Sequence, residues 1–326
     1  MNKKVKWGLL GTAGIAKNWT IPGMMEAVNC ELYAVAGRDL KKAEVFQSDF
    51  GFEKAYGSYE EMLADQELEA VYIPLPNELH YEWTIKALNA GKHVLCEKPL
   101  APTTEQIKEM FHCAQKNGVL LMEAFAYLHS PYIQAVKQEV ESGAIGEIVF
   151  MESSFLTSGY NQSNIRMRKE TFGGCTYDLG CYTTSQILTI MGEEPESIKA
   201  VAEFSDQGVD ILTSGIMKFA KGAKASFSCG MILGVELGNR VDRMLIYGTK
   251  GNIKSDTMFN QDGETQYSIT TGGVEVIRKV NAPQNYRLEI EQLGHCIIDG
   301  EEPAVPESFS MANGRMLERI LRQIGY

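Results

Sequence analysis

Residues 5–16 read VKWGLLGTAGIA, and this stretch decides the fold of the first part of the chain. VKWGLL is a short run typical of a buried strand, and GTAGIA is a glycine turn that leads into a helical pattern. Gly11 allows a tight turn, and the N–H groups that open the next helix attract anions such as a pyrophosphate. A strand, a glycine turn and a helix in this order are typical of a dinucleotide-binding unit.

The glycine turn departs from the usual fingerprint at two positions. Ala13 stands at the usual second glycine and Ala16 at the third. Alanine is the smallest replacement, so we expect a bound pyrophosphate to be displaced slightly outward. A purely structural strand–helix turn is the alternative interpretation, and the position of the turn after the first strand of a longer β-α series favours nucleotide binding.

The alternation of strand and helix continues to about residue 125. Apolar runs at CELYAVAGR, AVYIPLP, KHVLCEKPL and VLLMEAF are separated by segments with helical periodicity. Strands that are apolar on both faces belong to parallel sheets covered by helices on each side. Residues 1–125 are therefore predicted to form a doubly wound parallel sheet, the Rossmann domain of an α/β protein.

After residue 125 the pattern changes. One helix and the strand EIVFMESSF precede a polar loop and the segment GGCTYDLGCY, and then strands of alternating polarity follow one another without helices. This order predicts an α+β domain over residues 126–326 with a largely antiparallel open sheet. Two helices, from about Tyr286 and Ser308, close the chain, and a length of 326 residues agrees with two domains.

Composition excludes several classes of function. The net charge is −11 and no run of Lys and Arg occurs, which argues against binding to nucleic acid or to an anionic membrane. No apolar run approaches the ~20 residues of a membrane helix, and the start of the chain lacks the features of a signal peptide. Seven scattered cysteines without a CxxC pair indicate reduced thiols in the cytoplasm, and five histidines without HxxH spacing indicate no metal site.

The second predicted strand ends in AGRD, roughly twenty residues beyond the glycine turn. An acid at this place usually binds the adenosine ribose, whereas an arginine accommodates a 2′-phosphate. Arg38 comes first and Asp39 second. The order favours NADP over NAD, and a solvated loop cation is the alternative role of Arg38.

A later strand ends in C-E-K-P-L, which places Glu97 and Lys98 at the carboxyl edge of the sheet, where ligands of such sheets bind. EKP after a buried strand, PNELH after AVYIPLP, and GG-x3-D-x-G-x-Y in the second domain resemble the Gfo/Idh/MocA family of nicotinamide-dependent oxidoreductases. The resemblance spans nearly the whole chain. Many members carry histidine where this chain has Tyr182, so the motif looks more like the dihydrodiol and xylose dehydrogenase branch.

The resemblance implies a site residue by residue. It puts Arg38 near the adenosine ribose, and Glu97 and Lys98 beside the nicotinamide. His80 would flank the cofactor, with a buried structural histidine as the alternative. The remaining cofactor-binding positions that the resemblance implies are Gly11, Ala13, Gly14 and Ile15 at the diphosphate and Leu75, Pro76 and Asn77 beside His80.

Asp178 and Tyr182 are four residues apart, one helical turn, and are therefore expected on one face of a helix. A free tyrosine has a pKa near ~10, and a neighbouring ammonium such as Lys98 lowers it. Alcohol oxidation needs a base for the hydroxyl proton, and carbonyl reduction needs an acid. We expect Tyr182 to be that acid/base, Lys98 to tune it, and Asp178 to orient Lys98 or a second substrate hydroxyl.

Other residues are weaker candidates for contact with a substrate. Arg166 matches a family position ahead of the double glycine, and a solvated loop cation is its alternative role. Tyr160 and Phe155 are candidates for a wall that stacks on a sugar. The strands ASFSCGM and RMLIYG carry apolar residues on both faces, which together with the resemblance predicts a homodimer through this sheet.

The predicted function is hydride transfer between NADP or NAD and a hydroxyl or carbonyl group of a sugar, polyol or vicinal diol. Two alternatives share the fold. One is a glycosidase that retains NAD and oxidises its sugar only transiently, and the other is a non-enzymatic NADP-binding regulator. The presence of both Lys98 and Tyr182 favours the dehydrogenase.

Overall fold

The structure is a computed structural model that describes residues 3–234 and 239–326, and its chain divides into two units. One unit comprises Met1–His129 and Pro283–Met311, and the other comprises Ser130–Ala282 and Ala312–Tyr326. The expected division into residues 1–125 and 126–326 therefore needs a correction, because a late segment returns to the first unit. This segment carries buried Ile290 and Leu293. An amphipathic sequence pattern predicts that a helix buries one face. It does not identify the sheet against which that face packs.

The first unit contains a six-stranded sheet in the order β3-β2-β1-β4-β5-β6, and every pair in it is parallel. The predicted doubly wound sheet is confirmed. One edge strand was not predicted, because it has only three half-buried residues. The strands are β1 (Val5–Leu10), β2 (Cys30–Ala36), β3 (Lys54–Tyr56), β4 (Ala70–Ile73), β5 (His93–Glu97) and β6 (Leu121–Ala124).

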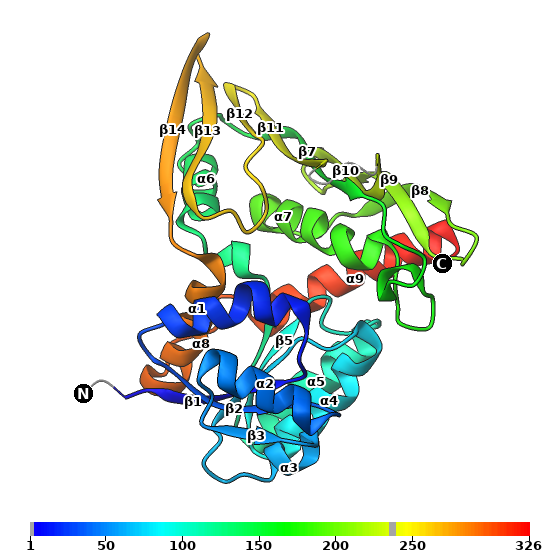
Figure 1. Cartoon of the computed structure of the whole chain (residues 1–326). Coiled ribbons are helices and arrows are strands. Elements are labelled where there is room, and N and C mark those ends of the chain that lie inside the picture. Colours follow the sequence, from blue (N-terminus) through cyan, green and yellow to red (C-terminus); the bar gives the residue numbers. More distant parts are fainter. Residues whose placement is uncertain (1–2, 235–238) are drawn as a thin grey trace. The chain divides into compact units, whose positions relative to one another are not determined.

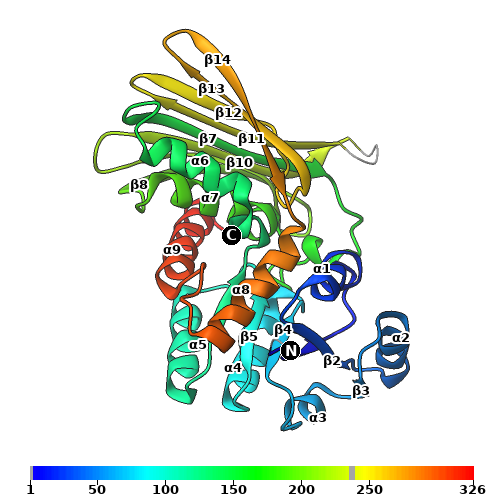
Figure 2. The same ribbon diagram turned by 90° about the vertical axis from the view of Figure 1, so that its left-hand side faces the viewer.

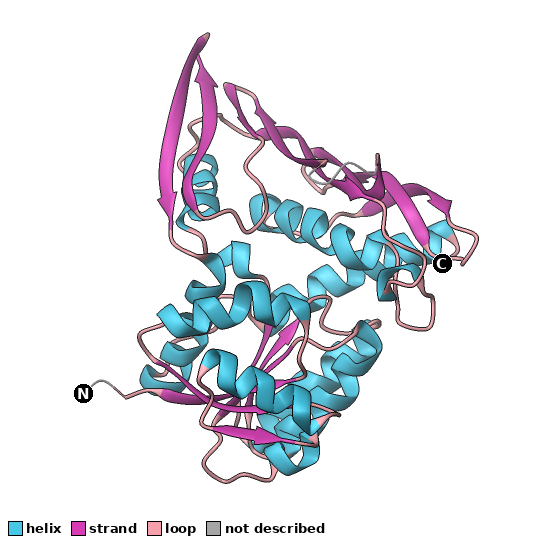
Figure 3. Ribbon diagram, viewed as in Figure 1, coloured by secondary structure: helices cyan, strands magenta, loops and turns pink. Residues whose placement is uncertain are grey.

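Helices flank this sheet, as Figures 1 and 3 show. They are η1 (Ala16–Thr20, a π-helical turn), α1 (Ile21–Glu26), α2 (Leu40–Phe50), α3 (Tyr59–Leu63), α4 (Asn77–Asn89), α5 (Thr104–Asn117), η2 (Ala126–His129) and α8 (Asn285–Asp299). Local sequence explains the start of α3. Ser58 Oγ accepts a hydrogen bond from Glu61 N at 3.1 Å, so Ser58 caps this helix. The apolar strands are buried on both faces, and β4 is buried at every position.

The second unit contains an eight-stranded sheet in the order β14-β13-β12-β11-β7-β10-β9-β8. β10 runs parallel to β7 and the other pairs are antiparallel, so the prediction of a largely antiparallel sheet is confirmed. The strands are β7 (Ile148–Ser158), β8 (Ser197–Phe204), β9 (Asp210–Lys218), β10 (Lys224–Leu233), β11 (Arg240–Gly248), β12 (Gly251–Ser255), β13 (Gly263–Thr271) and β14 (Val274–Ala282).

Helices lie along one face of this second sheet, which Figures 1 and 2 show from two sides. They are α6 (Pro131–Glu141), η3 (Ile165–Met167), η4 (Thr176–Gly180, a π-helical turn), α7 (Cys181–Met191) and α9 (Glu307–Ile324), which enters this unit at Ala312. Almost every residue of α7 is buried. In the described part of the chain, no helix has the length and apolar character required to cross a membrane.

Candidate functional site

The glycine turn at the end of β1 has the geometry that a dinucleotide site requires. Gly11 has φ +103°, which L side chains rarely adopt, and its N–H donates to Ala36 O at 2.8 Å. An added Cβ would lie 2.9 Å from Leu75 Cδ2, so no larger residue fits there. Gly14 opens the following helix and has no neighbour within 4 Å of an added Cβ. The turn and helix start therefore fit a diphosphate, with Ala13 and Ile15 between and beside the glycines.

Arg38 and Asp39, which follow β2, have different roles. Asp39 is the N-cap of α2, where its Oδ1 accepts a hydrogen bond from Lys41 N at 3.0 Å. Arg38 is exposed. Burial raises the pKa of Tyr59, and the positive charge of Arg38 opposes this rise. An added Cβ on Gly11 would lie 3.4 Å from the Tyr59 hydroxyl, so Arg38 acts on a tyrosine next to the glycine turn. Because the Asp39 carboxylate caps α2, the Arg38 cation is the charge that is available to a ligand at the glycine turn.

His80 is fully buried in the first unit. Its Nδ1 lies 2.9 Å from Pro99 O and its Nε2 lies 2.7 Å from Leu75 O, so two backbone carbonyls face the two ring nitrogens. Burial is the main cause that lowers the pKa of this histidine. The geometry favours the structural alternative. His80 joins the loop before α4, where Pro76 and Asn77 lie, to the loop after β5.

Glu97 is the last residue of β5 and Lys98 follows it, beside a chain of buried hydroxyls. Tyr72 donates to Glu97 Oε1 at 2.5 Å, and Thr20 Oγ1 donates to the Tyr72 hydroxyl at 2.9 Å. Burial, followed by the charge of Glu97, raises the pKa of Tyr72 well above its usual value. The phenol therefore stays protonated and holds the Glu97 carboxylate in place, while the next residue, Lys98, leads into a cis peptide bond to Pro99.

Two more buried acids lie within electrostatic reach of Glu97 and Lys98. Burial raises the pKa of Glu123 to about 7, and the positive charge of Lys98 opposes that rise. Glu123 Oε1 accepts a hydrogen bond from Leu100 N at 2.9 Å. Glu289 of α8 is fully buried, and burial and the charge of Glu97 raise its pKa well above the usual range. Lys98 is thus a cation close to the buried carboxyl group of Glu123, at an edge of the sheet that also carries Glu97.

In the second unit, the double glycine before η4 lets two segments approach the start of the helix. An added Cβ on Gly173 would overlap Arg166 O, and one on Gly174, which has φ +97°, would overlap Asp210 Oδ1. The Gly174 N–H donates to Arg166 O at 2.8 Å, and the Tyr326 hydroxyl donates to Gly173 O at 2.8 Å. Both glycines are therefore required by the close approach of other groups.

Asp210, the first residue of β9, anchors the helix that carries Asp178 and Tyr182. The carboxylate is fully buried. Its Oδ2 accepts hydrogen bonds from Thr176 N at 2.9 Å, Thr176 Oγ1 at 2.6 Å, Thr213 Oγ1 at 2.7 Å and Cys175 Sγ at 3.0 Å. A carboxylate at a helix N-terminus is stabilised by the helix dipole as well as by these donors. No sequence spacing links Asp210 to the motif, so the sequence did not identify it.

Asp178 is held by Arg166. Arg166 Nε donates to Asp178 Oδ2 at 2.7 Å, and the Asp178 charge is the main cause that raises the pKa of the guanidinium. Arg166 also lies over the Tyr160 ring, 5.1 Å from its centroid. The structure therefore brings all three predicted residues together, and Arg166 is a paired cation rather than a solvated one.

Tyr182 lies in the first turn of α7 and is 9% exposed. Its ring packs against Phe155 with centroids 5.5 Å apart and against Phe259 with centroids 5.1 Å apart. Its hydroxyl oxygen accepts a hydrogen bond from Asn260 Nδ2 at 3.3 Å. Phe155 thus positions the tyrosine ring. Phe259 and Asn260 lie in a turn between two strands and were not identified from the sequence.

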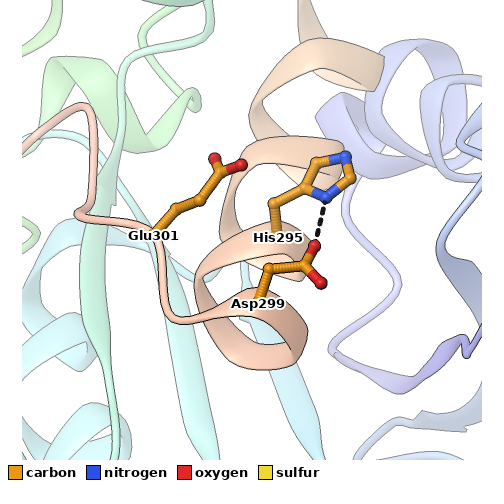
Figure 4. A group of neighbouring side chains, drawn as sticks. All are labelled: His295, Asp299 and Glu301. Carbon is orange, nitrogen blue, oxygen red and sulfur yellow. Dashed lines mark hydrogen bonds and ion pairs between the residues drawn. The ribbon is translucent and has the colours of Figure 1, made fainter.

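Among the described residues, one group has side chains of the types that bind metals. His295, Asp299 and Glu301 have ligand atoms that all lie within 4.8 Å of one another, at the end of α8 (Figure 4). His295 Nδ1 is hydrogen-bonded to Asp299 Oδ2 at 2.9 Å. The group is explained as a largely exposed i,i+4 pair with a neighbouring acid, and we assign no metal to it.

Both parts of the chain match known families. Residues 5–125 match the oxidoreductase family with an NAD-binding Rossmann fold, and residues 133–254 match the GFO/IDH/MocA C-terminal domain. The D-xylose 1-dehydrogenase (NADP(+)) 2 of Haloferax volcanii is 34% identical over 96% of this chain and 95% of the relative. The trans-1,2-dihydrobenzene-1,2-diol dehydrogenase of Xenopus laevis is 29% identical over 98% of both chains.

Solved structures agree with these matches. The 3-ketoreductase KijD10 from Actinomadura kijaniata, in complex with NADP and TDP-benzene, has a TM-score of 0.91 and 27% identity, over 98% of both chains. The two family matches together cover most of the sequence, in the order expected from the EKP and GG-x3-D-x-G-x-Y motifs. The chain therefore belongs to the Gfo/Idh/MocA family of NAD(P)-binding oxidoreductases.

Proposed function

We propose that this protein is an NADP-preferring dehydrogenase or reductase that acts on a hydroxyl or carbonyl group of a sugar, polyol or vicinal diol. The observation that carries the preference is the division of tasks at the end of β2, where Asp39 caps α2 and Arg38 is exposed. An arginine at this position can bind the 2′-phosphate that only NADP has. The relatives named as xylose and diol dehydrogenases support the substrate class.

NADP supplies the acceptor or donor of the hydride. Gly11, Ala13, Gly14 and Ile15 would hold its diphosphate at the helix start, and Arg38 its ribose phosphate. Leu75, Pro76 and Asn77 would flank it, and Glu97 with Lys98 would lie beside the nicotinamide. His80 would support this arrangement, since its two ring nitrogens lie 2.9 Å and 2.7 Å from the carbonyl oxygens of Pro99 and Leu75.

In oxidation Tyr182 removes the hydroxyl proton from the substrate, and in reduction it returns a proton to the developing alkoxide. Lys98 favours the tyrosinate and binds the substrate oxygen, since an ammonium in a water-poor site strongly stabilises negative charge. Asp178, held by Arg166 at 2.7 Å, accepts a hydrogen bond from a second substrate hydroxyl. Two vicinal hydroxyls of one substrate would contact Tyr182 and Asp178 at the same time, which supports polyhydroxylated substrates. Tyr160, which lies beside Arg166, would be a further contact for the substrate.

The direct test is a panel of sugars, polyols and vicinal diols, assayed for formation or consumption of reduced nicotinamide with NADP and with NAD. We expect net turnover that is fastest with NADP. Cleavage of glycosides without net reduction would instead indicate the NAD-retaining glycosidase. Tight NADP binding with no turnover on any member of the panel would indicate the regulator.

Lys98→Met tests the role of the lysine. We expect turnover to fall by several orders of magnitude in a folded protein that still binds NADP, because tuning and electrostatic stabilisation are lost together. Lys116→Met, at an exposed position in the last turn of α5, is the matched control. Near-normal turnover of Lys98→Met would remove Lys98 from the mechanism.

We also propose a homodimer through the sheet of the second unit. Its helices lie along one face, and exposed apolar side chains occur across its strands, among them Val201 at 74%, Ile216 at 47% and Ile277 at 62% exposed. Burial of such a face in a partner removes it from water. Sedimentation at micromolar concentration should give about twice the 36.2 kDa chain mass, and a single species at 36.2 kDa would refute the dimer. The seven free cysteines support a cytoplasmic location.

A further inference from the structure

Asn260 has an unusual backbone and a specific side-chain contact. It lies in the turn between β12 and β13, with φ +60°, a left-handed conformation that is uncommon for residues other than glycine and is tolerated best by asparagine. From this position its Nδ2 donates to the Tyr182 hydroxyl oxygen at 3.3 Å. Non-glycine residues in such conformations tend to occur at functional sites.

The turn is held in place from β11. Phe259 N donates to Asp242 Oδ1 at 2.8 Å, and Arg240 Nη2 donates to Phe259 O at 3.2 Å. Arg240 and Asp242 pair with each other at 2.7 Å through Nη2 and Oδ1, and Asp242 is only 5% exposed. The Phe259 ring packs on the Tyr182 ring. The contact between Asn260 and Tyr182 is therefore part of a packed, hydrogen-bonded arrangement.

We propose that Asn260 is a positioning residue for proton transfer by Tyr182. The proposal rests on the acid/base role proposed for Tyr182. An N–H that donates to a phenol oxygen stabilises the tyrosinate more than the neutral phenol. Because the oxygen accepts this bond, the Tyr182 hydroxyl proton does not take part in the contact with Asn260. In oxidation the Tyr182 tyrosinate would take the proton as the substrate O–H bond breaks, and the substrate C–H bond would release a hydride to NADP⁺ as the C=O bond forms; in reduction each change would reverse.

Other charges near Tyr182 in the same unit come from several elements. Arg166, which pairs with Asp178, is close enough for the Tyr182 charge to affect its ionisation. Arg240 and Asp242, which pair with each other, contact the two phenylalanines. Arg240 lies 4.5 Å from the Phe155 ring centroid, and Asp242 accepts a hydrogen bond from Phe259 N. Both are ion pairs whose charges partly cancel, whereas the Asn260 amide contacts the reacting oxygen directly.

Two substitutions separate this role from a structural one. Asn260→Gly removes the donor and suits the left-handed backbone, and Asn260→Asp keeps the shape but places a negative acceptor on the phenol. We expect the limb of the pH–rate profile that belongs to Tyr182 to move to higher pH in the order wild type, Gly, Asp. The shift for Gly should be about one pH unit, as for one hydrogen bond to a charged group, with about a tenfold loss of kcat/KM for oxidation at neutral pH.

NADP affinity should not change in either variant. Asn281→Asp, at an exposed position on β14, adds the same charge without a contact with Tyr182 and should leave the profile unmoved. The ionisation midpoint of Tyr182 is also measurable without turnover, from the ring carbon signal of labelled tyrosine that disappears in Tyr182→Phe. This signal should titrate higher in both Asn260 variants.

The outcomes distinguish the two proposals. If the limb is lost in Tyr182→Phe but neither the limb nor the tyrosine signal moves in the folded Asn260 variants, Asn260 has no such role and Tyr182 keeps its own. If Tyr182→Phe retains the limb, the acid/base role and the role of Asn260 are both refuted.

Discussion

Gly174→Ala perturbs the start of the helix that carries Asp178 and Tyr182. Gly174 has φ +97°, and a left-handed backbone costs an L side chain about 1–2 kcal/mol. The added Cβ would also overlap Asp210 Oδ1, far inside the 3.0 Å below which real Cβ contacts do not occur. Asp210 cannot move freely, because its other oxygen accepts the bonds that anchor Thr176 and Thr213. Overpacking of this kind costs about 1–3 kcal/mol, so the total loss should be about 2–5 kcal/mol.

Gly192→Ala is the matched control, since Gly192 ends α7 with φ +70° and nothing lies within 4 Å of an added Cβ. It should lose only the backbone part, about 1–2 kcal/mol. The free energy of unfolding of both variants is measured by denaturant titration followed by circular dichroism. Equal losses in the two variants would show that Asp210 does not occupy the space beside Gly174, and the anchoring role of Asp210 would be refuted.

Two further predictions follow from the first unit. Arg38→Ala should weaken NADP much more than NAD in equilibrium binding, since only NADP carries the 2′-phosphate; equal losses would contradict the assignment. Glu123→Gln should remove a pH dependence of stability. Burial raises the pKa of Glu123 from 4.5 to about 7 in the folded protein, so the folded state binds the extra proton and wild-type stability falls as pH rises from about 4.5 to 7. The variant should lack this fall, at most about 3 kcal/mol by linkage, in unfolding titrations across that range, and an unchanged slope would refute it.

The periodicity of the sequence predicted most of the fold, because continuous apolar strands alternate with amphipathic helices and each pattern is local. β3 was missed because three half-buried residues carry no periodic signal. The return of α8 to the first unit was missed because a pattern does not specify the sheet that a helix covers. The π-helical turns η1 and η4 depend on packing against neighbouring elements and have no local signature.

The candidate site was predicted where a motif carries several residues at fixed spacing, as around Lys98 and Tyr182. Residues that act on these from distant segments could not be found in this way. Asp210 reaches Thr176 from β9, and Asn260 reaches Tyr182 from a turn 78 positions later in the chain. Their side chains are ordinary turn and strand residues in the sequence, and only the tertiary structure brings them to the helix.

The most direct test of the proposed mechanism is the pH–rate profile of Tyr182→Phe. The substitution keeps the ring that packs on Phe155 and Phe259 and removes only the hydroxyl. NADP binding should be unchanged, and the chemical step should slow by about 10²–10⁴-fold, the usual contribution of general acid–base catalysis. The limb of the profile that belongs to Tyr182 should disappear. A folded Tyr182→Phe variant that keeps both its rate and this limb would contradict the mechanism, and Asp178 would then be the next candidate for proton transfer.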